Sequence, residues 1–326
     1  MNHKRFGMIA AFVMTGALAL TACNGDDSAG KTKSEQATSG ARVLGAYAKD
    51  TPGARYFGSV LSGTNEAPAG KQAVGDKDGR ATALMRIQGD DVSFAFAWTG
   101  TEAPTMGHLH QGAQGKNGDV RISFFTRKLK DAPYVYGTVK VHDDSLLEDI
   151  EAHPDDFYVN LHTAEFPGGA VRGQLAALPG KFSLPHAIAY SSLRSVVKGA
   201  QVYACTKQED GSYAFTQDGV EATLQGDIRH DFAEHGPAGP PRWTAPDGSA
   251  VTGTVLRKFD HGAGNIPQLL LRARQVGKGQ GLLAKTEAVL RLNTSGGVAP
   301  AGACDPAKQP TTRVPYQADY LFVSIR

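Results

Sequence analysis

The sequence lacks an excess of charge of either sign, because 34 Lys and Arg residues face 32 Asp and Glu residues in a chain of 326, a net charge of +2. The basic residues are scattered, so the chain has no basic patch of the kind that binds nucleic acid. A hydrophobic content of 41% excludes a fully disordered chain. With 39 Gly and 17 Pro, the composition favours a turn-rich β protein over a helical bundle.

The sequence also lacks the motifs of several enzyme classes. It contains no G-x-S-x-G nucleophile elbow and no H-E-x-x-H zinc motif, and no G-x-G-x-x-G stands between a strand and a helix. Paired carboxylates at a recognisable spacing, which polymer hydrolysis would need, are missing as well. These absences favour a binding protein over an enzyme.

The first apolar run, Met8 to Leu20, is too short for a transmembrane helix, which needs about 20 residues. It follows a positively charged start and therefore indicates a signal peptide. The run ends in Leu-Thr-Ala-Cys23, which resembles the signal of bacterial lipoproteins. The resemblance implies a signal peptide over residues 1–22, acylation of Cys23 and anchoring to a bacterial membrane outside the cytoplasm. An ordinary secretory signal with an incidental cysteine is the alternative.

Residues 23–46 are polar and contain no aromatic side chain, which predicts a flexible tether behind the lipidated cysteine. Within it, Gly25 to Thr32 fits the phosphate-loop pattern G-x-x-x-x-G-K-[ST]. That motif binds phosphate only between a buried strand and a helix, and Asp26 and Asp27 would repel phosphate. We therefore expect no nucleotide here.

Cysteine is scarce, with 3 residues in the chain. If Cys23 carries lipid, Cys205 and Cys304 are the one pair left to form a disulfide, which is expected outside the cytoplasm. Two buried free thiols are the alternative.

Residues 47–178 show the alternation of half-buried strands, for instance over Val92–Trp98 and Val120–Phe125. One short helix is expected at Ser145–Ala152, capped by Asp144 or Ser145 and stopped by the following proline. These signals predict an antiparallel β-sandwich or barrel.

The chemistry candidate of this half is a set of three histidines. His108 and His110 are two apart, so in a strand they share one face with Cα atoms about 6.5–7 Å apart. His162 also falls on the side of its segment away from the apolar residues. If the two strands are neighbours, the three imidazoles form a metal site open to solvent, suited to copper or zinc. Histidines that merely hydrogen-bond on a polar face are the alternative.

The same half resembles the CHRD (chordin-type) domain in four ordered segments. These are Phe57–Pro68 (FGSVLSGTNEAP), Gly107–Gly115 (GHLHQGAQG), Tyr158–Thr163 (YVNLHT) and Phe166–Leu175 (FPGGAVRGQL). The resemblance implies an extracellular all-β module without an established enzyme activity. The G-H-x-H-x-G stretch is also similar to one copper-ligand strand of copper-zinc superoxide dismutases, which suggests a copper-dependent envelope enzyme or copper carrier as the alternative function. Ala170 departs from the CHRD pattern, in which a Glu is usual.

Other polar residues of interest are expected to have structural roles. His142 and His153 are candidates for a fourth ligand, but solvated loops suit them better, and the same holds for His230 and His235, whose spacing is not typical of metal sites. Glu66 stands beside a proline turn and is expected to be a turn acid.

Residues 179–326 are again turn-rich and predict a second mainly β domain, with strands over the segments 201–205, 250–256, 268–273, 288–292 and 318–325. This half resembles a family known only as a domain of unknown function. The resemblance rests on Gly199–Cys205 (GAQVYAC), Trp243–Val251 (WTAPDGSAV), Ile266–Leu271 (IPQLLL), Asn293–Pro300 (NTSGGVAP) and Val314–Phe322 (VPYQADYLF). Both Cys205 and Cys304 occupy motif positions, which supports their pairing. Trp243 and Tyr316 are expected to anchor loops to the core, with an aromatic platform for a glycan or protein partner as the alternative.

Overall fold

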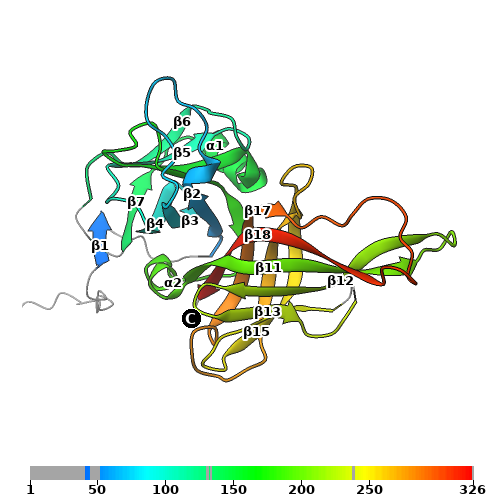
Figure 1. Cartoon of the computed structure of the whole chain (residues 1–326). Helices are drawn as coiled ribbons and strands as arrows, with labels where there is room; N and C mark the ends of the chain where they lie inside the picture. Colours follow the sequence, from blue (N-terminus) through cyan, green and yellow to red (C-terminus); the bar gives the residue numbers. More distant parts are fainter. Residues whose placement is uncertain (1–40, 45–51, 130–131, 133, 237–238, 325–326) are drawn as a thin grey trace, which may run out of the picture. The chain divides into compact units, whose positions relative to one another are not determined.

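The computed structural model describes residues 41–44, 52–129, 132, 134–236 and 239–324 (Figure 1). The predicted signal peptide over residues 1–22, the lipidation at Cys23 and the phosphate-loop pattern lie outside these residues. Within the segment assigned to the tether, Ala41–Leu44 forms a strand, β1. The fold is mainly β, as the sequence predicts, and its strands form two separate sheets.

The first sheet is 10-stranded and nearly closed, with the order β1-β7-β4-β3-β2-β9-β8-β5-β6 and with β10 paired to β2. Its neighbours are antiparallel except for β1, which runs parallel to β7. After β1, the strands are β2 (Arg55–Ser62), β3 (Arg80–Gln88), β4 (Asp91–Thr99), β5 (Met106–Gln111), β6 (Val120–Phe125), β7 (Tyr134–Lys140), β8 (Phe157–His162), β9 (Val171–Gln174) and β10 (Ala176–Leu178).

Aromatic and branched side chains on alternate positions build the core of this sheet. Val92, Phe94 and Phe96 of β4 are buried on one face, and the Phe94 ring lies 5.1 Å from that of Phe124. The predicted strands over 92–98 and 120–125 are therefore confirmed. The expectation that β4 is half-buried is wrong, because the intervening Ala95 is also fully buried, and it packs in a second apolar cluster with Val60, Leu84 and Leu178.

Short helices connect some of the strands. The predicted helix is confirmed as α1 (Asp144–Ala152), but its cap is Asp143, whose carboxylate accepts a hydrogen bond from the Leu146 amide at 3.0 Å. The 3-10 helix η1 (Gly63–Asn65) stands directly before Glu66, and the 3-10 helix η2 (Pro154–Asp156) stands directly before strand β8. Helix α2 (Leu184–Tyr190) was not expected, since its 7 residues are too few for a periodic pattern. In the described part of the chain, no helix has the length and apolar character needed to cross a membrane.

The second sheet is a closed antiparallel barrel, drawn from green to red in Figure 1. Its strands are β11 (Ser192–Lys207), β12 (Tyr213–Leu224), β13 (Ile228–Phe232), β14 (Pro241–Thr244), β15 (Ala250–Phe259), β16 (Gln268–Gln275), β17 (Thr286–Gly296) and β18 (Thr311–Ser324). The five segments predicted from sequence are the apolar parts of β11, β15, β16, β17 and β18, which extend further at one or both ends.

A group of stacked rings lies inside this barrel. The His230 ring stacks on Trp243 at 4.6 Å and 10°, and Tyr320 meets both rings edge-on. The expectation that His230 lies in a solvated loop is wrong, because β13 turns its side chain into the barrel. Trp243 and Tyr316 are buried, which confirms that they pack in the core and rules out an exposed aromatic platform at these two residues. The expectation that they anchor loops is wrong, because they lie in strands β14 and β18.

The disulfide between Cys205 and Cys304 is confirmed, with Cα atoms 5.9 Å apart and a sequence separation of 99. It ties β11 to the segment before β18, where the Cys304 amide also donates to the Tyr213 carbonyl at 3.1 Å.

Removing this disulfide should destabilise the barrel, because a cross-link over so long a loop restricts the unfolded chain strongly. We expect the Cys205→Ala, Cys304→Ala double variant to lose about 2–5 kcal/mol of unfolding free energy. The protein has 2 tryptophans, Trp98 in the first sheet and Trp243 in the second. Urea unfolding followed by tryptophan fluorescence in a Trp98→Phe background therefore isolates the barrel, and equal midpoints with and without the cysteines would contradict the prediction.

Candidate functional site

Three histidines are brought together by the register of β5 against β8. In this antiparallel pair Met106 lies opposite His162, His108 opposite Asn160, and His110 opposite Tyr158. Directly opposed residues share a face of the sheet, and so do residues two apart in one strand. The pairing that the sequence argument required is therefore present, and His108, His110 and His162 lie on one face.

The imidazole nitrogens are close enough to bind one ion. His108 Nδ1 lies 3.2 Å from His162 Nε2, and the ligand atoms of all three histidines lie within 4.8 Å of one another. Two nitrogens bound tetrahedrally at 2.0–2.1 Å from a zinc-sized ion are about 3.4 Å apart. The pair His108 and His162 already has this spacing, and His110 has to approach by only about 1 Å.

Backbone carbonyls determine which ring nitrogen of two histidines is protonated. His110 Nδ1 lies 3.0 Å from the Gly118 carbonyl, and His162 Nδ1 lies 3.0 Å from the Pro167 carbonyl. A carbonyl oxygen only accepts, so each Nδ1 carries the proton and each Nε2 keeps its lone pair. Such outer hydrogen bonds are typical of metal-binding histidines, whose orientation they fix.

Burial keeps the three imidazoles neutral. It lowers the pKa of His108 to about 4, with a further contribution from His162 and His110. Burial also lowers the pKa of His110 and of His162, against the opposing effect of their carbonyl partners. Neutral imidazole is the form that coordinates metal. The His110 Nε2 atom is buried and has no hydrogen-bond partner among the described residues, so its lone pair is available.

The site is only partly open to solvent. His162 is 8% exposed, and Asn160 and Arg172 on the same face are buried, whereas His108 and His110 are half-buried. Segments on either side of the strands shield part of this face, because the Gly118 and Pro167 carbonyls reach its histidines. The polar strand face indicated solvent in the sequence, and these loops restrict the solvent without excluding it.

Tyr158 and Arg172 hold His110 in place, and sequence analysis missed this role. The Tyr158 ring stacks on the His110 ring at 4.8 Å and 5°, and the Arg172 guanidinium carbon lies 3.4 Å from the centre of the Tyr158 ring on β8. Arg172 in turn donates to the carbonyls of Ala113 and Lys116. The sequence signal that could have indicated the role of Tyr158 was the alternation along its strand, which places Tyr158 on the same face as His162.

A half-buried carboxyl group adjoins this face. Asn160 Nδ2 donates to both oxygens of Glu66, at 3.2 and 3.1 Å. Burial raises the pKa of Glu66 to about 8, although Arg172 and Asn160 act in the opposite direction. Gly169 is required here, since it has φ +135° and an added Cβ would lie 2.7 Å from Glu66 Oε2. Glu66 is therefore more than the turn acid expected from sequence, being a carboxyl group that stays protonated at neutral pH.

The remaining sequence candidates do not join the cluster. His142 is exposed and lies 3.3 Å from Asp90, while His153 ends helix α1 and is exposed. His235 is exposed beside Asp218. In the chain as described, the three histidines of β5 and β8 are the one group of His, Cys, Asp and Glu side chains with metal-binding spacing. Ala170, the position where the sequence departs from the CHRD pattern, is fully buried, and its methyl side chain supplies no ligand.

The pKa of Glu66 predicts a pH dependence of stability. Between its ordinary value of 4.5 and its folded value of about 8, the folded state binds more protons than the unfolded chain. The contribution of Glu66 to the free energy of unfolding should therefore fall with rising pH across this window, on the order of 1 kcal/mol per pH unit, and level off above it. The buried histidines, whose pKa is lowered, contribute in the opposite direction below about pH 6.5, and their effect is common to the wild type and the variant. The Glu66→Gln variant lacks this effect, so it should gain stability relative to the wild type from pH 5 to 8.

Urea unfolding of both proteins at pH 5, 6.5 and 8, in a Trp243→Phe background that reports the first domain, measures this difference. Glu148→Gln on the exposed side of α1 is the matched control and should follow the wild type. A stability difference between the wild type and Glu66→Gln that stays constant over pH would show that the carboxyl is ionised in the folded protein.

Comparison with known proteins agrees with this organisation. Residues 57–175 match the family model of the CHRD domain, and residues 186–324 match a family described as a protein of unknown function, DUF3455. A search of curated proteins and a search of solved structures found no match. The histidine site thus lies within the segment that matches the CHRD model, and the closed barrel lies within the segment that matches the DUF3455 model.

Proposed function

We propose that this chain is an envelope binding protein, anchored through lipid on Cys23, whose CHRD domain holds one copper ion on His108, His110 and His162. The observation that carries the proposal is the convergence of three neutral imidazoles whose nitrogens lie within 4.8 Å. The pairing of β5 with β8, the carbonyl partners of two rings and the lowered pKa values all support the same conclusion.

The chemistry of the donor set favours copper, with zinc as the next choice. All three donors are imidazole nitrogens, which suit copper and zinc, whereas calcium and magnesium require oxygen ligands. Glu66 is protonated at neutral pH and does not supply one. Divalent copper binds nitrogen sites more tightly than zinc in the usual order of affinities.

Binding is favoured over catalysis because the sequence offers no nucleophile motif and loops shield part of the ligand face. We also propose that the partner of this binding protein is a protein or a glycan of the cell envelope. The second candidate is a copper-dependent enzyme or copper carrier. It is favoured by one feature, since three ligands leave a coordination position free for an exchangeable group.

Metal titration of the mature protein, without the predicted signal peptide over residues 1–22, tests the site. We expect the wild type to bind one Cu²⁺ per chain and the variants His110→Ala and His162→Ala to bind about 100-fold more weakly or not at all. His142→Ala, which removes an exposed histidine away from the cluster, is the matched control and should bind like the wild type. Isothermal titration and elemental analysis measure affinity and stoichiometry, and an unchanged affinity in both cluster variants would refute the metal site. Superoxide turnover by the copper-loaded protein would favour the enzyme.

Lipid anchoring is tested separately. The segment Leu20–Cys23 supports lipid anchoring because it resembles the signal of bacterial lipoproteins. Several acyl chains on Cys23 would give stable membrane attachment. We expect the wild type expressed in a bacterium to incorporate labelled fatty acid and to enter the detergent phase on phase separation, and Cys23→Ser to lose the label. Ser28→Ala in the predicted tether, which leaves all cysteines in place, is the control, and labelling that persists in Cys23→Ser would contradict the prediction.

A further inference from the structure

The closed barrel contains a cavity that is independent of the histidine site. Its volume is about 480 Å³, which lies in the usual range for small-molecule sites. An eight-stranded barrel can be filled by its side chains or can hold one small ligand. The space that remains inside this barrel indicates that it can hold a small ligand.

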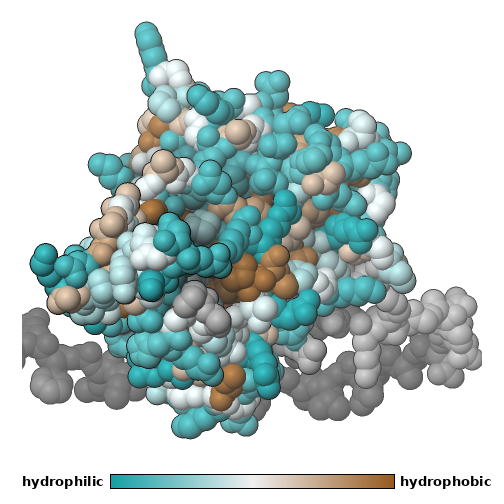
Figure 2. Space-filling view, turned by 90° about the vertical axis from the view of Figure 1, so that its right-hand side faces the viewer, coloured by the Kyte–Doolittle hydropathy of each residue, from teal (hydrophilic) through white to brown (hydrophobic). Residues whose placement is uncertain are grey.

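The cavity wall is mainly apolar. Val220, Phe232, Trp243, Ile266, Leu269 and Leu271 contribute to it. Val255 and Val298 also line the cavity and are 40% and 43% exposed, so apolar residues continue to the surface. Figure 2 shows apolar residues within a hollow of one face, with hydrophilic residues around them. This lining favours a ligand with an apolar body.

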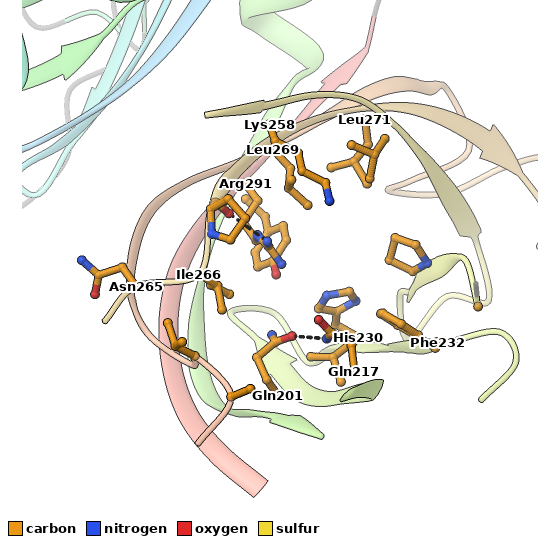
Figure 3. A pocket seen from close by; sticks show the side chains of 18 of the residues that line it. Gln201, Gln217, His230, Phe232, Lys258, Asn265, Ile266, Leu269, Leu271 and Arg291 are labelled. Atoms are coloured by element: carbon orange, nitrogen blue, oxygen red, sulfur yellow. Dashed lines mark hydrogen bonds between the residues drawn. The ribbon is translucent and has the colours of Figure 1, made fainter. Parts of the chain in front are cut away.

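Two cations face this apolar space from one row of the barrel. The strand registers place Lys258 opposite Leu269, and Leu269 opposite Arg291, so the three residues share the inner face. Figure 3 shows Lys258 and Arg291 directed toward the cavity, with His230 on the other side. The lining includes no Asp or Glu. An anionic group in the cavity would therefore meet positive charge without repulsion.

Arg291 is incompletely satisfied by the protein. Its Nη2 donates to the Pro267 carbonyl at 2.8 Å and the guanidinium also hydrogen-bonds the Tyr320 side chain, but its Nε is buried and has no hydrogen-bond partner within the described chain. No carboxylate among the described residues forms an ion pair with it. A partly buried guanidinium without a carboxylate is costly unless another anion pairs with it. A planar carboxylate fits the fork of guanidinium donors.

Further donors in the cavity lack acceptors. Gln217 Nε2 donates to Gln201 Oε1 at 2.7 Å, which leaves the buried Gln201 Nε2 unpaired among the described residues. The Trp243 Nε1 is likewise buried and unpaired there. His230 is a neutral ring because burial lowers its pKa to about 3, and its Nδ1 donates to the Arg242 carbonyl. The buried side-chain atoms of this lining that lack a partner among the described residues are N–H donors, which calls for oxygen acceptors on the ligand.

We propose that the barrel binds a carboxylate with an apolar body, of the size of a medium-chain fatty acid, with its anionic head on Arg291. The apolar wall holds the body of the ligand, Lys258 adds positive charge near the mouth, and the carboxylate oxygens accept from the guanidinium. A bare inorganic anion does not fit, because it would leave the apolar wall without a partner. A neutral lipid does not fit, because it would leave the guanidinium unpaired.

Decanoate, with decan-1-ol as a neutral probe of equal chain length, tests the proposal on the full-length protein in phospholipid nanodiscs. Trp243 lines the cavity, so its fluorescence in a Trp98→Phe background reports occupancy. We expect saturable decanoate binding that weakens about 10-fold to 100-fold in Arg291→Gln, while decanol binding is weak and the same in both proteins. Both probes also partition into the lipid of the nanodisc, but to the same extent for all variants, so this partition does not affect the comparison between variants.

Arg274→Gln is the matched control, since it removes an exposed arginine of β16 that does not line the cavity. Lys258→Gln keeps the proposal testable if Arg291→Gln fails to fold. We expect it to weaken decanoate binding about 3-fold, and we expect this difference to become smaller at high salt. Equal binding of decanoate and decanol by the wild type, or decanoate binding that is unchanged in Arg291→Gln, would overturn the proposal.

Discussion

The register of β5 against β8 is the constraint on which the chemistry of the first domain depends. A shift of this pairing by one residue would turn His162 to the opposite face and separate it from His108 and His110. The apolar residues Leu109 and Val159, opposite each other on the core side, fix the register because both are fully buried. The hydrophobic core therefore positions the polar site indirectly, through the pleat of the sheet.

Desolvation then sets the charge state of the groups gathered there. It disfavours charge of either sign, so it lowers the pKa of the histidines and raises the pKa of Glu66. At neutral pH the face offers neutral nitrogen donors and a protonated carboxyl group, beside the cation of Arg172. This combination suits an ion that binds imidazole strongly and disfavours hard cations that need carboxylates.

The second domain uses the same geometric rule for a different purpose. Opposed positions on β15, β16 and β17 bring Lys258 and Arg291 to one side of an apolar interior. In the first domain, loops cover the polar face of an almost closed sheet, whereas in the second the closed barrel itself encloses the space. Each domain thus places polar groups where water is restricted, which strengthens electrostatic interactions and hydrogen bonds at these positions.

Residue periodicity by itself determined much of this protein. It indicated a mainly β chain, the strand around Phe94, the helix α1 and the shared face of His108 and His110, because these are properties of neighbouring residues. Only the tertiary structure decided the neighbour of each strand, the loops that cover the histidines, the burial of His230 and the row that carries Arg291. Those features join residues far apart in the chain, and local patterns contain no information on which distant strand closes a sheet.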